Sequence, residues 1–174
     1  MDDAPATTGW PHPRSRDGGI DEIPLPHGPG RLWLCGKHVV GPDPERVLAA
    51  LGATTIVCLT RRHELDQRFP DYVAWLDDHV DDRAVWFPID DLHAPSLGAV
   101  ESFVADVAAR LDRGEGIVMH CAAGIGRAGT VATCVLIALG LDVDAALSVV
   151  AANRPMAGPE VGAQRELVLA FKRR

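Results

Sequence analysis

The chain has 174 residues, of which 47% are hydrophobic, and this size and composition fit one globular domain. Acidic residues number 24 and lysines plus arginines 17, so the formal net charge is −7. A chain this acidic repels polyanions, which disfavours nucleic acid and anionic membranes as partners. The longest largely apolar run, residues 129–141, is shorter than the ~18 residues that a membrane-spanning helix needs. We therefore expect no nucleic-acid partner and no membrane partner, and any anion site must be built locally.

The cysteines, the histidines and the amino terminus bear on compartment and metal content. The four cysteines form no CxxC pair and no zinc spacing, so they are interpreted as reduced thiols. The histidines show no metal-binding spacing such as HExxH. The first residues are acidic and lack a basic start followed by an apolar core, which argues against a secretory signal. These features predict a cytoplasmic protein that uses no metal and no cofactor.

Proline, glycine and charged residues dominate residues 1–30, and six prolines interrupt any periodic pattern there. This stretch is predicted to be an irregular arm, with residues 23–25 as its candidate contact with the sheet. From Arg31 onward the pattern is that of a globular protein without internal repeats. We expect a single domain over residues 31–174.

Within this domain, short apolar runs alternate with segments that carry helix-capping residues. The expected strands are residues 31–35, 54–59, 84–87 and 116–120. The expected helices are residues 43–51, 63–79 with an interruption at Pro70, 96–113, 129–139, Asp142 or Asp144 to 153, and 160–174. Strands separated by helices predict an α/β fold in which a central, mostly parallel sheet is flanked by helices on both faces.

The segment from Ile117 to Thr130 holds most of the functional information. Cys121 stands where a buried strand ends, and Arg127 follows six positions later, next to the start of a helix. Glycines at 124, 126 and 129 let the backbone curl so that successive N–H groups point inward, which makes an anion site at a helix N-terminus. Arg127 adds a planar fork for two phosphate oxygens, and the same donors stabilise a thiolate. A nucleophile beside an anion site predicts phosphoryl transfer to sulfur.

Other interpretations of this segment fit less well. Residues 124–129 match GxGxxG, as in a dinucleotide site, but the segments that follow are all helical where such a domain needs further strands. A nucleoside-triphosphate loop would need a Lys after the glycines, and none is present. A third interpretation is that Cys121 is an ordinary buried thiol and that the glycines only form a turn. It fits less well because it gives Arg127 no role.

The pattern His120-Cys121-x5-Arg127 resembles the signature of the protein tyrosine phosphatase superfamily, small dual-specificity type. Pro88–Pro95, about 30 residues upstream, is most similar to the acid-bearing loop of cyclin-dependent kinase inhibitor 3-type phosphatases, and this register places the acid on Asp91, with Asp90 as the alternative. The strand and turn of residues 56–65 resemble the same group. The similarity extends over residues 31–174.

The resemblance implies a phosphomonoesterase that removes phosphate from phosphotyrosine proteins, with phosphoserine and phosphothreonine proteins as a further substrate class. Cys121 would attack phosphorus and form a cysteinyl-phosphate. Asp91 would protonate the leaving oxygen and would then accept a proton from water in the second half-reaction. His120 would support the loop backbone, and Gln164 would orient the hydrolytic water, although an exposed helix glutamine is an equal interpretation. The phosphate-binding residues would be Ala122, Ala123, Gly124, Ile125, Gly126 and Arg127.

Ala128 departs from the family pattern, because a Ser or Thr normally follows the signature arginine and donates to the departing thiolate. This difference predicts slower hydrolysis of the phospho-enzyme and leaves open an alternative function, a weakly active or inactive phosphoprotein-binding module. A rhodanese-like sulfurtransferase or an arsenate reductase is a third alternative, which the Asp91 segment disfavours.

Two weaker signals lie near the strand of residues 54–59. Cys58 is the best candidate for a protective disulfide with an oxidised Cys121, although a buried strand cysteine is the favoured interpretation. The run of residues 61–63, Arg-Arg-His, either flanks the pocket or is an ordinary solvated turn.

Overall fold

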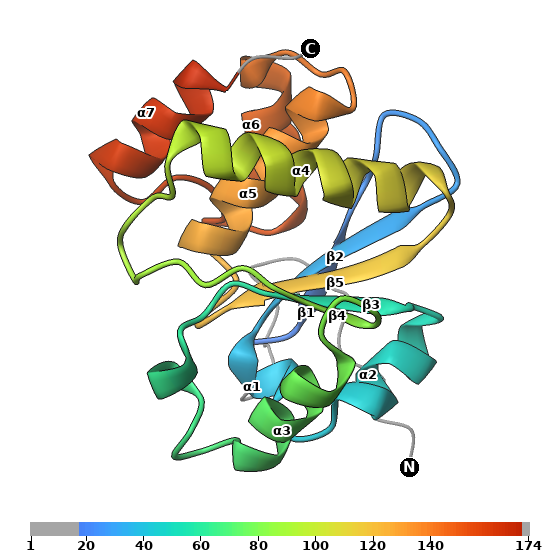
Figure 1. Cartoon of the computed structure of the whole chain (residues 1–174). Helices are drawn as coiled ribbons and strands as arrows, with labels where there is room; N and C mark the ends of the chain where they lie inside the picture. The colour runs from blue at the N-terminus through green and yellow to red at the C-terminus, as the bar shows by residue number, and fades with distance from the viewer. Residues whose placement is uncertain (1–17, 172–174) are drawn as a thin grey trace.

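A five-stranded sheet divides the molecule into two layers of helices (Figure 1). The computed structural model describes residues 18–171, so predictions about residues 1–17 and 172–174 lie outside the described residues. The strand order is β1-β2-β5-β3-β4, with β1 antiparallel to β2 and the other pairs parallel. The strands are β1 (Ile20–Ile23), β2 (Arg31–Gly36), β3 (Thr55–Cys58), β4 (Ala84–Trp86) and β5 (Gly116–Cys121). The predicted α/β fold with a mostly parallel sheet is confirmed.

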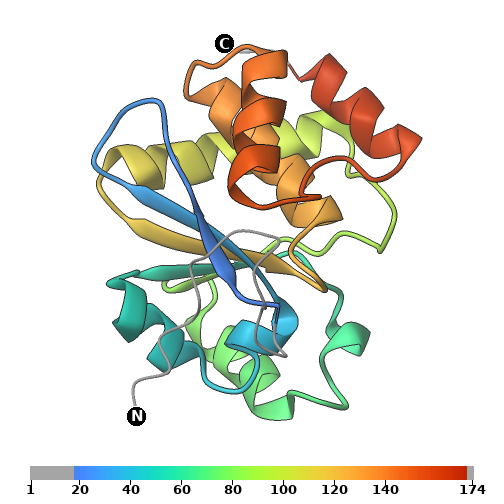
Figure 2. The same cartoon turned by 180° about the vertical axis from the view of Figure 1, so that it is seen from behind.

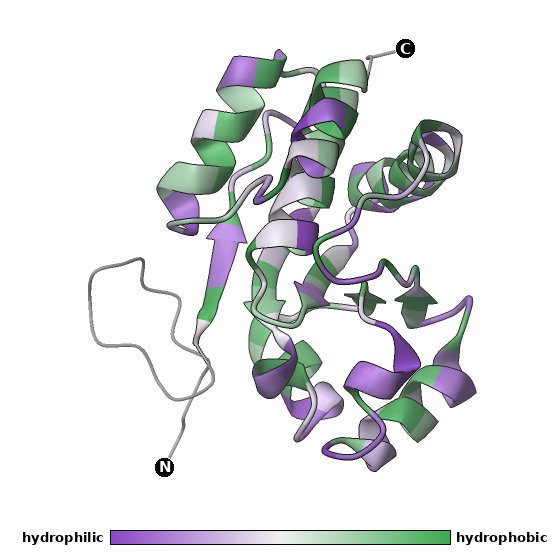
Figure 3. Ribbon diagram, turned by 90° about the vertical axis from the view of Figure 1, so that its left-hand side faces the viewer, coloured by the Kyte–Doolittle hydropathy of each residue, from purple (hydrophilic) through white to green (hydrophobic). Residues whose placement is uncertain are grey.

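Helices cover both faces of this sheet, as predicted (Figures 1 and 2). One face carries α1 (Lys37–Val40), α2 (Pro44–Leu51) and α3 (Pro70–His79). The other face carries α4 (Leu97–Asp112), α5 (Gly126–Ala138), α6 (Val143–Asn153) and α7 (Gly162–Ala170). In Figure 3 the central strands, between the two helix layers, are coloured mainly as apolar.

The alternation of side chains along each strand separates two apolar cores. On β2, Leu32 and Leu34 pack in the core under α4 to α7, whereas Trp33 and Cys35 pack in the core under α1 to α3. All four side chains are buried. Alternate residues of a strand therefore pack in opposite cores, and the same alternation determines in which core each strand cysteine lies.

Local capping signals set several helix ends as expected. The Asp43 side chain accepts a hydrogen bond of 3.0 Å from the Arg46 amide at the start of α2, and Gly52 ends that helix in the left-handed conformation with φ of 63°. For α6, the cap left open between two aspartates is Asp142, which accepts a 2.8 Å hydrogen bond from the Ala145 amide.

Several features differ from the sequence-based expectations. β1 lies inside the stretch predicted as an irregular arm, so the domain begins before residue 31. α1 was not predicted. The interruption predicted near Pro70 is present, since residues 63–79 divide into a 3₁₀ turn (Arg62–Glu64) and α3, which begins at Pro70. α5 begins three residues earlier than expected. Within the described part of the predicted helix 160–174, α7 spans Gly162–Ala170. β1 is a four-residue strand whose pairing depends on β2, so its own residues carry too little pattern to reveal it.

None of the helices within residues 18–171 is long and apolar enough to cross a membrane.

Candidate active site

β5 is flanked by β2 and β3 and delivers Cys121 to the carboxyl end of the parallel strands. Open α/β sheets bind ligands at this edge. The loop of residues 121–127, called the Cys121 loop below, leads directly into α5, whose N-terminus carries a partial positive charge. The Cys121 side chain is buried, and the Gly124 amide donates a hydrogen bond of 3.2 Å to its Sγ. This contact stabilises a thiolate at Sγ.

The carbonyl groups of residues 121–125 in the Cys121 loop all accept hydrogen bonds from groups that lie outside the loop's concave face. The Cys121 carbonyl accepts from His120 Nδ1 at 3.1 Å, and the Ala122 carbonyl accepts from the Lys37 amide at 3.0 Å. The Ile125 carbonyl accepts from the Gly158 amide at 3.1 Å.

Arg154 holds the two remaining carbonyls. Its Nη2 donates to the Ala123 carbonyl at 2.8 Å, and its Nε donates to the Gly124 carbonyl at 2.7 Å. In a trans peptide the C=O and the next N–H point in opposite directions. With the carbonyls turned outward, the N–H groups of residues 122–126 face the centre of the loop, as the Gly124 contact to sulfur illustrates. The Cys121 loop is thus a preformed set of inward N–H donors.

A buried ion pair anchors Arg154. Its Nη1 lies 2.7 Å from Asp21 Oδ2, and both residues are buried. Asp21 belongs to β1, so the strand missed from the sequence positions the arginine that shapes the Cys121 loop. The sequence analysis assigned no role to either residue. Asp21 and the loop carbonyls are separated from Arg154 by 133 and about 30 positions, so no local pattern links them.

His120 supports the loop backbone as a neutral imidazole. Its Nδ1 contacts a carbonyl, which only accepts, so Nδ1 carries the proton and Nε2 accepts a 2.7 Å hydrogen bond from the Tyr72 hydroxyl. Complete burial lowers the pKa of His120 to about 4. The expected supporting role of His120 agrees with this geometry.

Arg127 is held as a planar fork by Glu64. Its Nη1 and Nη2 each donate to one Glu64 carboxylate oxygen at 2.8 Å, and Nη1 also donates to the Ile89 carbonyl at 2.8 Å. Despite the burial of this carboxyl group, the hydrogen bond from Arg127 keeps the pKa of Glu64 below its usual range. Sequence reasoning did not find Glu64, although it lies in the stretch of residues 56–65 that resembles the family.

Only one of the two candidate acids approaches Arg127. Asp91 Oδ1 lies 3.4 Å from Arg127 Nη2, and the Asp91 side chain is 67% exposed. Asp90 is engaged elsewhere, because Arg61 donates to its two carboxylate oxygens at 2.8 and 3.3 Å. The loop of residues 88–95, called the Asp91 loop below, therefore brings Asp91 and not Asp90 to the Cys121 loop.

Gln164 lies between the Asp91 loop and the segment before α7. It is buried, its Nε2 donates to the His93 carbonyl at 3.2 Å, and its Oε1 accepts from the Glu160 amide at 2.8 Å. Both ends of its amide are used by backbone groups. Gln164 therefore ties the Asp91 loop to the segment before α7, and its expected role in orienting the hydrolytic water stays a prediction.

Cys58 and Cys121 pack in different cores. Cys58 lies in the core under α1 to α3, whereas Cys121 and Leu59 lie in the core under α4 to α7. Burial raises the pKa of the Cys58 thiol to about 11, which suppresses the reactive thiolate. The geometry thus does not support the proposed Cys58–Cys121 disulfide, because the central sheet separates the two side chains.

The position after Arg127 gives no hydroxyl to the site. Ala128 is buried in the core, and the Thr130 hydroxyl has no hydrogen-bond partner within residues 18–171. Thr130, two residues further along α5 than Ala128, therefore donates no hydrogen bond to Cys121 in this structure.

The basic run of residues 61–63 lies beside the Asp91 loop. These three residues line a cavity of about 580 Å³ together with Asp66, Trp86 and Pro88. Arg61 is paired with Asp90, and Arg62 is paired with Asp77 at 2.7 Å and lies over the Trp86 ring. Both arginines are therefore already neutralised by partners of this chain.

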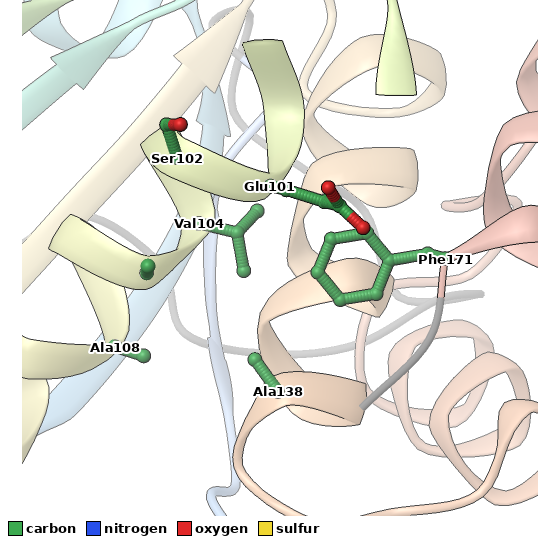
Figure 4. A pocket seen from close by; sticks show the side chains of 7 residues that line it. Glu101, Ser102, Val104, Ala108, Ala138 and Phe171 are labelled. Carbon is green, nitrogen blue, oxygen red and sulfur yellow. The ribbon is translucent and has the colours of Figure 1, made fainter. Parts of the chain in front are cut away.

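A second cavity, of about 360 Å³, lies away from this site (Figure 4). Side chains from α4 point into it toward Ala138 and Phe171. Ala138 ends α5, whereas the Cys121 loop meets its beginning, so roughly 18 Å of helix separates the two regions. No group of three or more potential metal ligands occurs among residues 18–171.

The family model described as "Swiss Army Knife protein, DSP-PTPase phosphatase domain" matches residues 29–168. The chain therefore belongs to the DSP-PTPase phosphatase domain family, as the signature around Cys121 predicted. This match begins two residues before Arg31, close to the predicted domain boundary.

Proteins that resemble this chain in structure or sequence are also phosphatases. Tk-PTP in its active form shares 22% identity with a TM-score of 0.65, covering 87% of this chain and 95% of its own. A kinase-associated phosphatase with a serine in place of its catalytic cysteine shares 22% identity with a TM-score of 0.68, covering 81% and 85% of the two chains. The protein PTEN1 of Arabidopsis thaliana, a phosphatidylinositol 3,4,5-trisphosphate 3-phosphatase and protein-tyrosine-phosphatase, is 33% identical over 101 residues. That alignment covers 52% of this chain and only 24% of the relative.

Proposed function

We propose that this chain hydrolyses phosphomonoesters of phosphotyrosine proteins, and of phosphoserine and phosphothreonine proteins, through a cysteinyl-phosphate intermediate. The observation that carries the proposal is the Cys121 loop. Its carbonyls are bound from outside, its N–H groups converge, and the Arg127 fork closes one side. Such preorganised donors stabilise the charge on the equatorial oxygens of a transferring phosphoryl group.

In the first step the Cys121 thiolate attacks phosphorus, an S–P bond forms and the bond from phosphorus to the substrate oxygen breaks. Asp91 gives its proton to the leaving oxygen. Its position 3.4 Å from Arg127, with most of its side chain exposed, leaves it free to face a substrate held by that arginine. In the second step Asp91 accepts a proton from water, the water oxygen bonds to phosphorus as the S–P bond breaks, and phosphate leaves.

Protein substrates are favoured over highly charged inositol phosphates. The variable positions of the Cys121 loop are Ala122, Ala123 and Ile125, so no lysine stands inside it. The net charge of −7 also repels a polyphosphorylated headgroup. A second function, binding of phosphoproteins with little turnover, is favoured by one observation, the absence of a hydroxyl donor at Ala128.

Metal-free hydrolysis of an aryl phosphate from about pH 5 to about pH 8 tests the proposal. We expect activity in the parent chain, none in Cys121→Ser, and an altered pH profile in Asp91→Ala. An Asp90→Ala variant keeps Asp91 and should retain more activity. Absence of turnover, together with binding of phosphopeptides that phosphate competes away, would contradict the enzyme and favour the binding module.

A further inference from the structure

Arg61 and Asp90 form an ion pair directly beside the candidate acid. Arg61 Nε donates to Asp90 Oδ1 at 2.8 Å and its Nη2 donates to Oδ2 at 3.3 Å, so the guanidinium contacts both carboxylate oxygens. Arg61 follows β3, whereas Asp90 lies in the Asp91 loop, one position before the acid. The hydrogen bond from Arg61 keeps the pKa of Asp90 below its usual range, so the pair is charged at neutral pH. The pair therefore joins two distant segments of the chain next to the acid.

Glu64 connects this pair to Arg127. Its Oε2 accepts one hydrogen bond of 2.8 Å from the Arg61 backbone amide and another of 2.8 Å from Arg127 Nη1. Arg127 Nη1 also donates to the carbonyl of Ile89, the residue before Asp90. The contacts thus form a closed ring in which the Asp91 loop is bound to Arg127 from one side and to Arg61 from the other. This ring fixes the loop relative to the arginine of the phosphate site.

Within residues 18–171 most of the Arg127 donors are in use. A guanidinium has five N–H groups. Glu64 takes two of them and Ile89 takes a third, and Asp91 lies 3.4 Å from Nη2. A phosphate bound by Arg127 would therefore take Nε and the Nη2 donor that faces Asp91. Asp91 then loses this contact, and in the protonated form that a general acid needs it has no charge to attract the guanidinium.

The contact at Asp90 does not compete with the phosphate in this way. The two backbone anchors of the Asp91 loop, at the carbonyls of Ile89 and His93, lie further from the acid along the chain. Arg61 contacts the residue directly before Asp91 and uses no donor of the phosphate site. Its contact with the loop can therefore be kept when substrate occupies the Cys121 loop.

We propose that Arg61, through Asp90, holds Asp91 in position to protonate the leaving oxygen. This inference rests on the proposed function and adds two positioning residues to its first step. In that step the Asp91 proton passes to the substrate oxygen while the bond from this oxygen to phosphorus breaks and the S–P bond forms. Arg61 and Asp90 exchange no proton and do not touch the phosphate. Their pair places the acid before the substrate arrives, so less binding energy is needed to orient it.

The leaving group of the substrate distinguishes positioning of the acid from other effects. The ratio kcat/KM covers the steps up to release of the leaving alcohol, and phenyl phosphate needs protonation of its leaving oxygen far more than nitrophenyl phosphate does. In Arg61→Met we expect kcat/KM for phenyl phosphate to fall by about fivefold, an effect within reach of an exposed ion pair, and that for nitrophenyl phosphate to change by less than about twofold. Asp90→Asn should give the same pattern. The double variant should lose no more than either single variant, because both residues act through one contact.

Arg62→Met is the matched control. Arg62 lines the same cavity as Arg61 and makes a similarly exposed bidentate pair, but its partner is Asp77 on α3 and not the Asp91 loop. Its kcat/KM should be unchanged for both phosphates. Asp91→Ala is the reference for complete loss of the acid, and it should show the same dependence on the leaving group to a larger extent.

Three results would overturn the inference. Equal losses for both phosphates in Arg61→Met would show that this variant disturbs the Arg127 fork and not the acid. No loss for either phosphate would show that the pair positions nothing. A loss in Arg61→Met that Asp90→Asn does not share would mean that Arg61 contacts the substrate itself. A parent chain that hydrolyses neither phosphate would instead contradict the proposed function, so the two failures are distinguishable.

Discussion

The guanidinium of Arg127 is fixed by the carboxylate of Glu64 through two hydrogen bonds of 2.8 Å, although the residues are 63 positions apart. The Arg127 side chain is 2% exposed and that of Glu64 is 15% exposed. A bidentate pair restricts the guanidinium to one plane, so its remaining donors have a fixed direction toward a phosphate in the Cys121 loop. The orientation of the charge clamp therefore depends on a residue outside the signature segment.

Replacement of Glu64 by Gln should impair catalysis more than it lowers the stability of the fold. In this variant an NH2 group replaces one carboxylate oxygen. The NH2 group cannot accept a hydrogen bond from the guanidinium, so Arg127 is no longer fixed in one plane. We expect kcat/KM for an aryl phosphate to fall by about one to two decades, which corresponds to ~1.5–3 kcal/mol of transition-state stabilisation. Asp77→Asn is the control, because it breaks an exposed bidentate pair with Arg62 that does not reach the site. An unchanged rate in Glu64→Gln would contradict this role.

His120 should make the stability of the fold depend on acid pH. Its pKa falls from 6.5 in the unfolded chain to about 4 in the folded one, so the unfolded chain binds more protons between these values. The contribution is fully present above pH 6.5 and is lost as the pH falls toward 4, by about 3 kcal/mol in total. Denaturant unfolding at several pH values measures the slope. His120→Asn should flatten this part of the curve, whereas exposed His63→Gln should not; equal slopes in all three chains would contradict the assignment.

Arg154→Met should remove the donors that turn two loop carbonyls outward and should break the buried ion pair with Asp21. We expect loss of activity and destabilisation by about 3–5 kcal/mol. The double variant with Asp21→Asn should regain much of the stability without regaining activity, because the carbonyls of the Cys121 loop still lack their donors. Recovery of both properties in the double variant would show that Arg154 acts on stability alone.

Ala128→Ser should speed turnover by restoring a hydroxyl that donates to the departing thiolate. A charge-assisted donor contributes ~1.5–3 kcal/mol, or about one to two decades in the rate of phospho-enzyme hydrolysis. Position 128 is fully buried, so the new hydroxyl has no access to bulk water. Thr130→Val is the control, because the Thr130 hydroxyl makes no hydrogen bond within the described residues. A rate that stays the same or falls in Ala128→Ser would exclude this explanation.

Mild peroxide treatment followed by peptide mapping should yield no Cys58–Cys121 linkage. The two side chains lie in different cores, and the pKa of Cys58 is raised to about 11 by burial. Cys121 should instead be recovered as a sulfenic or higher oxidised form. Detection of the disulfide would show that the sheet edge rearranges on oxidation.

The sequence by itself determined the parts of the protein that are contiguous in the chain. The Cys121 loop, the strand before it and the helix after it lie in one continuous segment. The residue types of this segment are enough to predict its strand, its glycine-rich loop and its helix. Helix caps such as Asp43 were predicted for the same reason, since a cap bonds to an amide three residues away. The α/β fold class followed from the alternation of strand and helix patterns.

Only the tertiary structure decided which distant residues support this segment. Glu64 and Arg154 contact the Cys121 loop from distant parts of the chain, and their local sequence does not indicate which face of the sheet they approach. Cys58 shows the same limit, because a shift of one position along a strand moves a side chain to the opposite core. Local hydrogen bonds and periodicity can be inferred from neighbouring residues, whereas contacts between distant residues depend on the packing of the whole chain.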